Sequence, residues 1–99
     1  MADILLTFHC APHDTDMVAR AIRTISDAPV HVCEQTVHGR DFDDASTAER
    51  VAGRLRRSAL ELIVDEEVLG ALVQAVGKAA RSLPVRWHSV PVLARGRIA

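Results

Sequence analysis

Residues 59–76 read ALELIVDEEVLGALVQAV, and the spacing of the apolar residues changes at Asp65. The six residues before Asp65 form an apolar run with the length and composition of a strand. After the acidic residues, apolar side chains recur at i, i+1, i+4, i+5 and i+8, which is one face of a helix: Val68, Leu69, Leu72, Val73 and Val76. Acidic residues suit the start of a helix because they offset its free amide groups and its positive end. The stretch therefore predicts a strand followed at once by an amphipathic helix.

The same pattern occurs once earlier in the chain. The apolar run ILLTF begins at Ile4, Asp14 and Asp16 follow it, and a second set of apolar residues has helical spacing: Met17, Val18, Ala21, Ile22 and Ile25. Each predicted helix is followed by a proline, which stops a helix, and then by another apolar run. These runs are VHVCEQTV from Val30 and VRWHSVPVL from Val85. The chain therefore reads β-α-β twice.

Two β-α-β units of this size predict an α+β, ferredoxin-like βαββαβ fold, with a four-stranded antiparallel sheet in the order 4-1-3-2 and both helices on one face. A chain of 99 residues with 48% hydrophobic content has enough apolar surface for one core, so we expect a single domain, 1–99. Period-two alternation directs one set of side chains at the helices: Ile4, Leu6, Phe8, Val30, Val32, Leu60, Leu62 and Val64.

The opposite face of the predicted sheet has no helix left to cover it. The alternation places Leu5, Ile63 and Val90 on that face. An exposed apolar patch of this kind usually marks an interface. We therefore expect an oligomer that closes the face.

Composition excludes several classes of function. The formal net charge is −1, with 12 basic and 13 acidic residues, so no general attraction to nucleic acid is expected. Two phenylalanines, one tryptophan and no tyrosine are also too few for a sheet that stacks RNA bases. No apolar run has the basic lead of a signal peptide or the length of a membrane span. We predict a cytoplasmic protein that binds no nucleic acid and does not insert into a membrane.

The first strand-to-helix turn, residues 9–16, reads HCAPHDTD and does not suit the enzymes of this size. It lacks the glycine-rich phosphate loop with an arginine that acylphosphatases need, and it holds one cysteine where heavy-metal-associated domains need two. Cys10 and Cys33 are expected about two strand spacings apart, roughly 9 to 10 Å, which is too far for a disulfide. We predict a non-enzymatic protein with both thiols reduced.

Residues 37–57, VHGRDFDDASTAERVAGRLRR, form a polar segment between two apolar runs. Connections in compact domains are usually a few residues long, and longer ones are functional or disordered. Within the segment, Ser46 and Glu49 have the spacing of a capping box, and Gly53 can end a helix. Two interpretations follow: a loop that responds to a ligand, or one capped and solvated helix with no ligand.

The chain resembles the PII-like proteins of the GlnB and CutA superfamily, in particular a short branch often found with heavy-metal efflux genes. The resemblance covers nearly the whole chain and rests on the order of elements, on Gly39, on ERVAG at 49–53, and on five tail residues: Trp87, Pro91, Val92, Gly96 and Arg97. It implies a homotrimer whose sheets line the centre, with residues 38–57 as the T-loop. It also implies a regulatory protein that senses a small ligand or metal and acts on a protein partner, such as a metal efflux or transport component. The alternative is a CutA-like trimer that acts in metal tolerance by binding metal alone.

The candidate ligand-binding residues are Gly39, Arg40, Arg54, Arg95 and Arg97, and the candidate partner-contacting residues are Asp43, Asp44, Glu49 and Arg50. Arginines hold anions through forked hydrogen bonds. Nucleotide-binding PII proteins carry a glycine-rich loop between the second helix and the last strand, whereas here residues 78–87 read KAARSLPVRW with no glycine after Gly77. ATP binding in the usual PII manner is therefore not expected, and a small anionic effector remains open.

Histidine supplies a second signal, with five residues in the chain. His31 and Cys33 are two apart on one strand and lie some 7 Å apart on one face, which suits a soft metal if a third ligand comes from elsewhere. His9 and His88 belong to adjacent strands and make a second pair. The candidate transition-metal ligands are thus His9, His31, Cys33 and His88. The alternative is a set of hydrogen-bonded histidines at a subunit interface.

Overall fold

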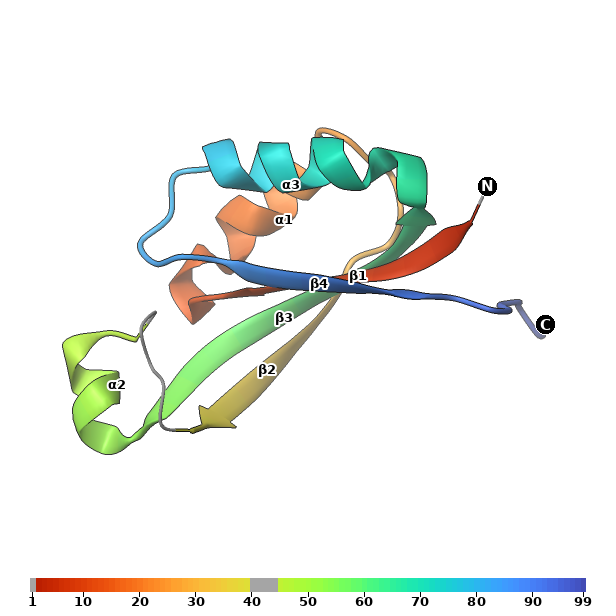
Figure 1. The fold of residues 1–99 in the computed structure, drawn as a ribbon. Coiled ribbons are helices and arrows are strands. Elements are labelled where there is room, and N and C mark those ends of the chain that lie inside the picture. Colours follow the sequence, from red (N-terminus) through yellow and green to blue (C-terminus); the bar gives the residue numbers. More distant parts are fainter. Residues whose placement is uncertain (1, 40–44) are drawn as a thin grey trace.

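A computed structural model describes residues 2–39 and 45–99 (Figure 1). Along the chain it contains β1 (Asp3–Cys10), α1 (Thr15–Arg23), β2 (His31–His38), α2 (Thr47–Ala52), β3 (Arg54–Asp65), α3 (Leu69–Lys78) and β4 (Arg86–Pro91). Short 3-10 turns, η1 (Pro12–Asp14) and η2 (Glu66–Val68), lead into α1 and α3.

The four strands form one antiparallel sheet in the order β2-β3-β1-β4. This is the predicted order 4-1-3-2 read from the other edge, so the ferredoxin-like α+β prediction is confirmed. Helices α1 and α3 lie together over one face of the sheet (Figure 1). The register pairs Phe8 with both Leu60 and Trp87, which places all three residues on the face that the helices cover.

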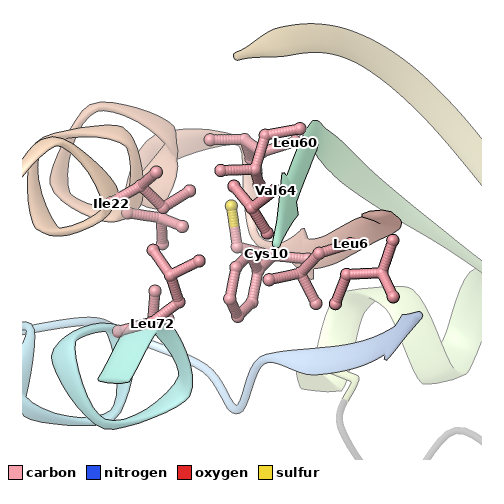
Figure 2. Packing of buried hydrophobic residues seen from close by; sticks show 11 residues of the cluster. Leu6, Cys10, Ile22, Leu60, Val64 and Leu72 are labelled. Carbon is pink, nitrogen blue, oxygen red and sulfur yellow. The ribbon is translucent and has the colours of Figure 1, made fainter. Parts of the chain in front are cut away.

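The core lies between this face and the two helices (Figure 2). The predicted core positions of β1 and β3 are buried, and they contact four buried helix residues: Val18, Ile22, Leu72 and Val76. Each fully buried side chain of this kind stabilises the fold by about 1.5 to 3 kcal/mol. Val32 lies on the predicted face, which it shares with Leu60, but it is not a core residue because its side chain is 50% exposed. The reason is that β2 is the outermost strand, where little of the helix layer covers it.

The acidic residues before the two helices play different roles. Asp65 caps η2 by accepting a hydrogen bond from the Glu67 amide at 2.9 Å, as the sequence predicts for a helix start. Asp14 makes no capping hydrogen bond and instead contacts Ser82 in the α3–β4 connection. Of the two acids expected at the start of this helix, Asp14 therefore does not cap free amides, because its carboxylate binds a partner 68 residues away.

The connection inside the predicted polar segment, 37–57, is shorter than the segment itself. β2 continues to His38 and β3 already begins at Arg54, so the connection between them is 39–53 and three of its expected arginines lie in a strand. The pairing of His38 with Arg54 and of Val37 with Leu55 extends the two strands as a ribbon. Backbone hydrogen bonds between the two strands can form such a ribbon without alternating apolar residues. Because its side chains are largely charged, the spacing of apolar residues did not predict it.

Within the described parts of the chain, no helix is both long enough and apolar enough to cross a membrane.

Candidate functional site

The face of the sheet opposite α1 and α3 is the candidate site, and we call it the open face. Strand register places its residues in rows across the sheet. One row holds Leu5, Ile63 and Val90; the next holds Thr7, Glu61, His31 and His88; and a third holds His9, Ala59, Cys33 and Arg86. The open face thus joins an apolar row to two rows that carry all four predicted metal ligands.

His9 and His88 are the predicted metal ligands that the fold brings together. Their rings stack with centroids 5.4 Å apart and an angle of 18° between the planes. Nδ1 of His9 lies 3.0 Å from Oε1 of Gln35, and because an amide oxygen only accepts, this contact favours the tautomer with its proton on Nδ1. The other ring nitrogen of His9, Nε2, is then the one with a free lone pair. This is the tautomer in which a histidine can bind a metal ion through Nε2.

The second predicted pair, His31 and Cys33, lies on β2 with both side chains exposed. Cys33 is separated from His9 by Ala59 of β3, and His31 is separated from His88 by β3 and β1. Among residues 2–39 and 45–99, no three histidine, cysteine or acidic side chains are placed to hold one metal ion. Within one copy, the four predicted ligands therefore form two pairs and not one site.

The apolar part of the open face is incompletely covered. Leu5 and Ile63 are half-buried, whereas Val90 of the same row is 44% exposed. Thr7 and Ala59, near the centre of the face, are buried. The face is therefore apolar at one end and carries imidazoles in the middle, which suits contact with another protein surface.

The second candidate region is the end of the β2–β3 ribbon, where α2 follows the predicted capping box. Oγ of Ser46 accepts from the Glu49 amide, Oε1 of Glu49 accepts from the Ser46 amide, and Gly53 ends the helix with φ of 74°. Only a residue without a side chain adopts that φ readily, which explains the glycine. The sequence prediction of this capped helix is confirmed.

Glu49 was expected to contact a partner, but its carboxylate is used inside the chain. It accepts a hydrogen bond from the Arg56 amide at 2.7 Å and lies 3.0 and 3.1 Å from Nη1 of Arg57. Burial opposes ionisation, but the hydrogen bonds from Arg56, Arg57 and Ser46 outweigh it and lower the pKa of Glu49. Glu49 therefore fastens α2 to β3, while the neighbouring Arg50 is exposed on the helix.

The remaining predicted ligand residues are distributed over the molecule. Arg54 lines a shallow hollow beneath α2 together with Thr36 and Arg56, and Gly39 is exposed at the end of β2. Arg95 lies at the other end of the sheet, where its Nε is 3.2 Å from Oδ2 of Asp3.

Asp3 pairs with Asp65 at the far end of β3, so Arg54 and Arg95 are separated by the length of this 12-residue strand, roughly 36 Å. One chain therefore does not assemble the predicted arginines into one anion site. Arg97 is exposed in the same tail as Arg95. Arg40, Asp43 and Asp44 lie outside the described residues.

Sequence reasoning missed a cluster in which the buried Asp14 contacts the exposed residues Ser82 and His13. The amide and the hydroxyl of Ser82 both donate to the Asp14 carboxylate, at 3.0 and 2.9 Å to Oδ2, and Nε2 of His13 contacts Oγ of Ser82. The single hydroxyl proton of Ser82 goes to Asp14, so His13 must be the donor in its own contact and does not act as a base on Ser82. The cluster fastens η1 to the α3–β4 connection. Residues 68 positions apart carry no sequence signal for such a contact.

Two further pKa shifts follow from burial and hydrogen bonding. Burial opposes the ionisation of Asp14, but the hydrogen bonds from Ser82 outweigh it and lower the pKa of that carboxyl. Burial raises the pKa of the Cys10 thiol, whose sulfur lies in the core (Figure 2). Neither group lies on the open face.

These features define a ferredoxin-like α+β protein with one sheet face covered by helices and one left open. The chain matches, over residues 4–99, the family model described as a protein of unknown function, DUF3240, and it belongs to that family. A search of curated proteins found no match.

Solved structures share the fold at low sequence identity. A DUF3240 family protein from Shewanella baltica OS155 superposes with a TM-score of 0.74 at 14% identity, covering 100% of this chain and 99% of that chain. A Bacillus cereus protein related to NIF3 gives a TM-score of 0.72 at 12% identity, and the match covers 97% of this chain but only 26% of that protein. A functionally unknown protein from Pediococcus pentosaceus ATCC 25745 gives 0.63 at 12% identity, with 99% of each chain covered. At these identities the likeness concerns the fold alone.

Proposed function

We propose that this protein is a non-enzymatic, PII-like trimer that binds a small effector or a metal ion and transmits the bound state to a protein partner. The observation that carries the proposal is the open face, which has an apolar row beside the stacked pair His9 and His88. An exposed apolar row that α1 and α3 do not cover favours association, and the resemblance to PII-like proteins supports a trimer with the sheets at its centre.

Light scattering tests the assembly. We expect three times the 10.8 kDa chain mass at micromolar concentration. Ile63→Asp places a charge in the apolar row and should lower the mass toward that of one chain, whereas Val51→Asp, on the 86% exposed Val51 of α2, should not. A wild-type protein that is monomeric over the whole concentration range would sink the trimer.

Transmission to a partner is assigned to the end of the β2–β3 ribbon, including α2. The ribbon projects beyond the part of the sheet that α1 and α3 cover, so a protein bound there would not disturb the core (Figure 1). The resemblance to the short branch near heavy-metal efflux genes supports a cytoplasmic role in metal homeostasis, with a component of a metal efflux or transport system as the partner.

Calorimetric titration identifies the class of effector. ATP and ADP should give no heat of binding, because the α3–β4 connection has no glycine-rich phosphate loop. Copper, zinc and nickel ions are titrated in parallel, and each titration is repeated with His9→Ala and with the exposed His38→Ala as a control. Absence of binding by every nucleotide and every metal tested would contradict a role in metal sensing.

The second candidate function is metal tolerance by binding alone, as in CutA-like trimers. It is favoured by one observation: the hydrogen bond from Nδ1 of His9 to Gln35 leaves Nε2 of His9 as the available ligand atom. Metal binding that leaves the exchange rates of the α2 amides unchanged would support this candidate over signalling. Metal binding that alters those rates would support the first.

A further inference from the structure

A groove with a volume of about 510 Å³ lies between α1 and α3, and we call it the helix groove. Its apolar walls come from one stripe at each helix, with residues at intervals of four: Met17, Ala21 and Ile25 on the α1 side, and Ala71, Ala75 and Ala79 on the α3 side. Each stripe lies one position before a core stripe, which contains Val18 and Ile22 in α1 or Leu72 and Val76 in α3. Since neighbouring helix positions point about 100° apart, the helix groove opens away from the core.

The apolar surface of the helix groove is only partly used within the chain. Ile25 is 41% exposed, and Met17, Ala21 and Ala75 are half-buried. The apolar arc of α1 is therefore wider than the core needs. On the α3 side the wall is alanine, whose short side chain leaves room between the helices. A wall of small side chains lets a third helix approach to the usual interaxial distance of about 8 to 10 Å.

The charge of the helix groove is positive. Each wall carries one cation, Arg20 on α1 and Lys78 on α3, and no acidic residue in the described parts of the chain lines the groove. Neither cationic side chain forms an ion pair or a hydrogen bond with another described residue. The whole chain has a net charge of −1, so this positive charge is a local feature. The complementary occupant has an apolar face with an acidic residue on either side.

We propose that the helix groove binds an amphipathic helix of a protein partner, with the acidic residues of that helix beside Arg20 and Lys78. The lining extends from Met17 to Ile25, about 12 Å at a rise of 1.5 Å per residue, which is about two turns of a bound helix. The groove is open to solvent, so one side of its occupant stays in water. A helix has a polar side for that position, whereas an alkyl chain does not. This contact is additional to the one in the proposed function, which lies at the end of the β2–β3 ribbon.

Two fluorescein-labelled model peptides test the charge and the shape of the occupant. Both have leucine and alanine on one helical face, and glutamates flank this face in the first peptide where lysines flank it in the second. We expect fluorescence anisotropy to show that the wild-type protein binds the acidic peptide at least about tenfold more tightly, because ion pairs replace like-charge contacts. Equal affinity for the two peptides, or no binding of the acidic one, would overturn the proposal.

Charge reversal locates the binding. Arg20→Glu combined with Lys78→Glu should reverse the preference, so that the basic peptide binds more tightly than the acidic one. The matched control is Arg23→Glu combined with Arg97→Glu, which changes the net charge equally at exposed positions outside the groove lining. This control should keep the preference of the wild type. A reversal in both double variants would assign the effect to the overall charge and would overturn the groove as the site.

Filling the helix groove gives a second measurement that does not depend on charge. Ala75→Leu adds apolar volume to one wall and should weaken binding of the acidic peptide at least about tenfold, because the added side chain occupies the space of the bound helix. Ala80→Leu, at an exposed position outside the lining, should leave the affinity unchanged. Thermal melts of both variants report whether the fold is kept. Unchanged affinity of a folded Ala75→Leu variant would contradict the proposal.

A small amphiphile is the competing occupant. Dodecanoate is titrated into the wild type and into Ala75→Leu, with dodecylammonium as the control of opposite charge. If dodecanoate binds only to the wild type and neither peptide binds, the helix groove is a site for a small anionic amphiphile and the proposed helix is wrong. Binding of the acidic peptide that dodecanoate does not displace supports the helix.

Discussion

Glu49 of α2 and Arg57 of β3 form an ion pair in which one guanidinium nitrogen lies 3.0 and 3.1 Å from the two carboxylate oxygens. The Arg57 side chain is only 5% exposed, so the pair is largely withdrawn from water. The same carboxylate also accepts from the amides of Ser46 and Arg56. The Glu49 carboxylate therefore fastens α2 to β3.

We expect Glu49→Gln to destabilise the protein by about 1.5 to 3 kcal/mol, because it weakens charge-assisted hydrogen bonds in a mostly buried setting. Glu34→Gln is the matched control. Glu34 also faces an arginine, Arg56, but at 3.9 Å with both side chains exposed, so its loss should cost less than about 0.5 kcal/mol. Urea unfolding of the two variants decides the question. Equal midpoints would show that the Glu49 pair contributes nothing beyond a surface contact.

The lowered pKa values of Asp14 and Glu49 predict a loss of stability in acid. A carboxyl whose pKa is lower in the folded state than in the unfolded state stabilises the fold fully above the unfolded pKa. That contribution is lost as pH falls through the lowered, folded pKa. The contribution of these two carboxyls should therefore be complete above about pH 5 and should decline below the ordinary carboxyl values of 3.8 for Asp and 4.5 for Glu.

Chemical denaturation at a series of pH values measures this decline. Asp14→Asn and Glu49→Gln should each flatten the curve, whereas Glu34→Gln should leave its shape unchanged. If the stability of Asp14→Asn and of Glu49→Gln falls with decreasing pH as steeply as that of the wild type, other groups cause the pH dependence.

Leu62→Asp should abolish folding. Leu62 is 1% exposed in the core between the sheet and the helices, and burying an unpaired carboxylate there costs several kcal/mol against a total stability of about 5 to 15. Circular dichroism should show no cooperative melt. Val51→Asp, at an exposed position, should melt within a few degrees of the wild type, and a similarly normal melt for Leu62→Asp would mean that the strand register is wrong.

Cys10 should be inert in the folded protein, because its thiol is buried in the core and burial raises its pKa. In the Cys33→Ser background, Cys10 is the only thiol left. Iodoacetamide should then label less than about a tenth of the native protein in the time that labels all of it in urea. Rapid labelling of the native variant would show that the β1–α1 corner opens without global unfolding.

The sequence by itself determined the order of elements and the covered face of the sheet. Apolar spacing changes from period two to helical period at Asp65 and again near Asp14, and these local periods decide which residues point inward. The capping box of Ser46 and Glu49 with Gly53 was equally readable, because hydrogen bonds three residues apart depend on the local chain alone.

Tertiary structure alone decided the contacts that position the candidate site. His9 meets Gln35 and His88, and Asp14 meets Ser82, only because strand pairing and helix docking bring distant segments together. The spacing of apolar residues did not predict the ribbon of β2 and β3, because backbone hydrogen bonds hold its strands together while its charged side chains reach water. Val32 has the period of a core residue but lies at an edge, and alternation assigns a face without saying how far the helices extend over it.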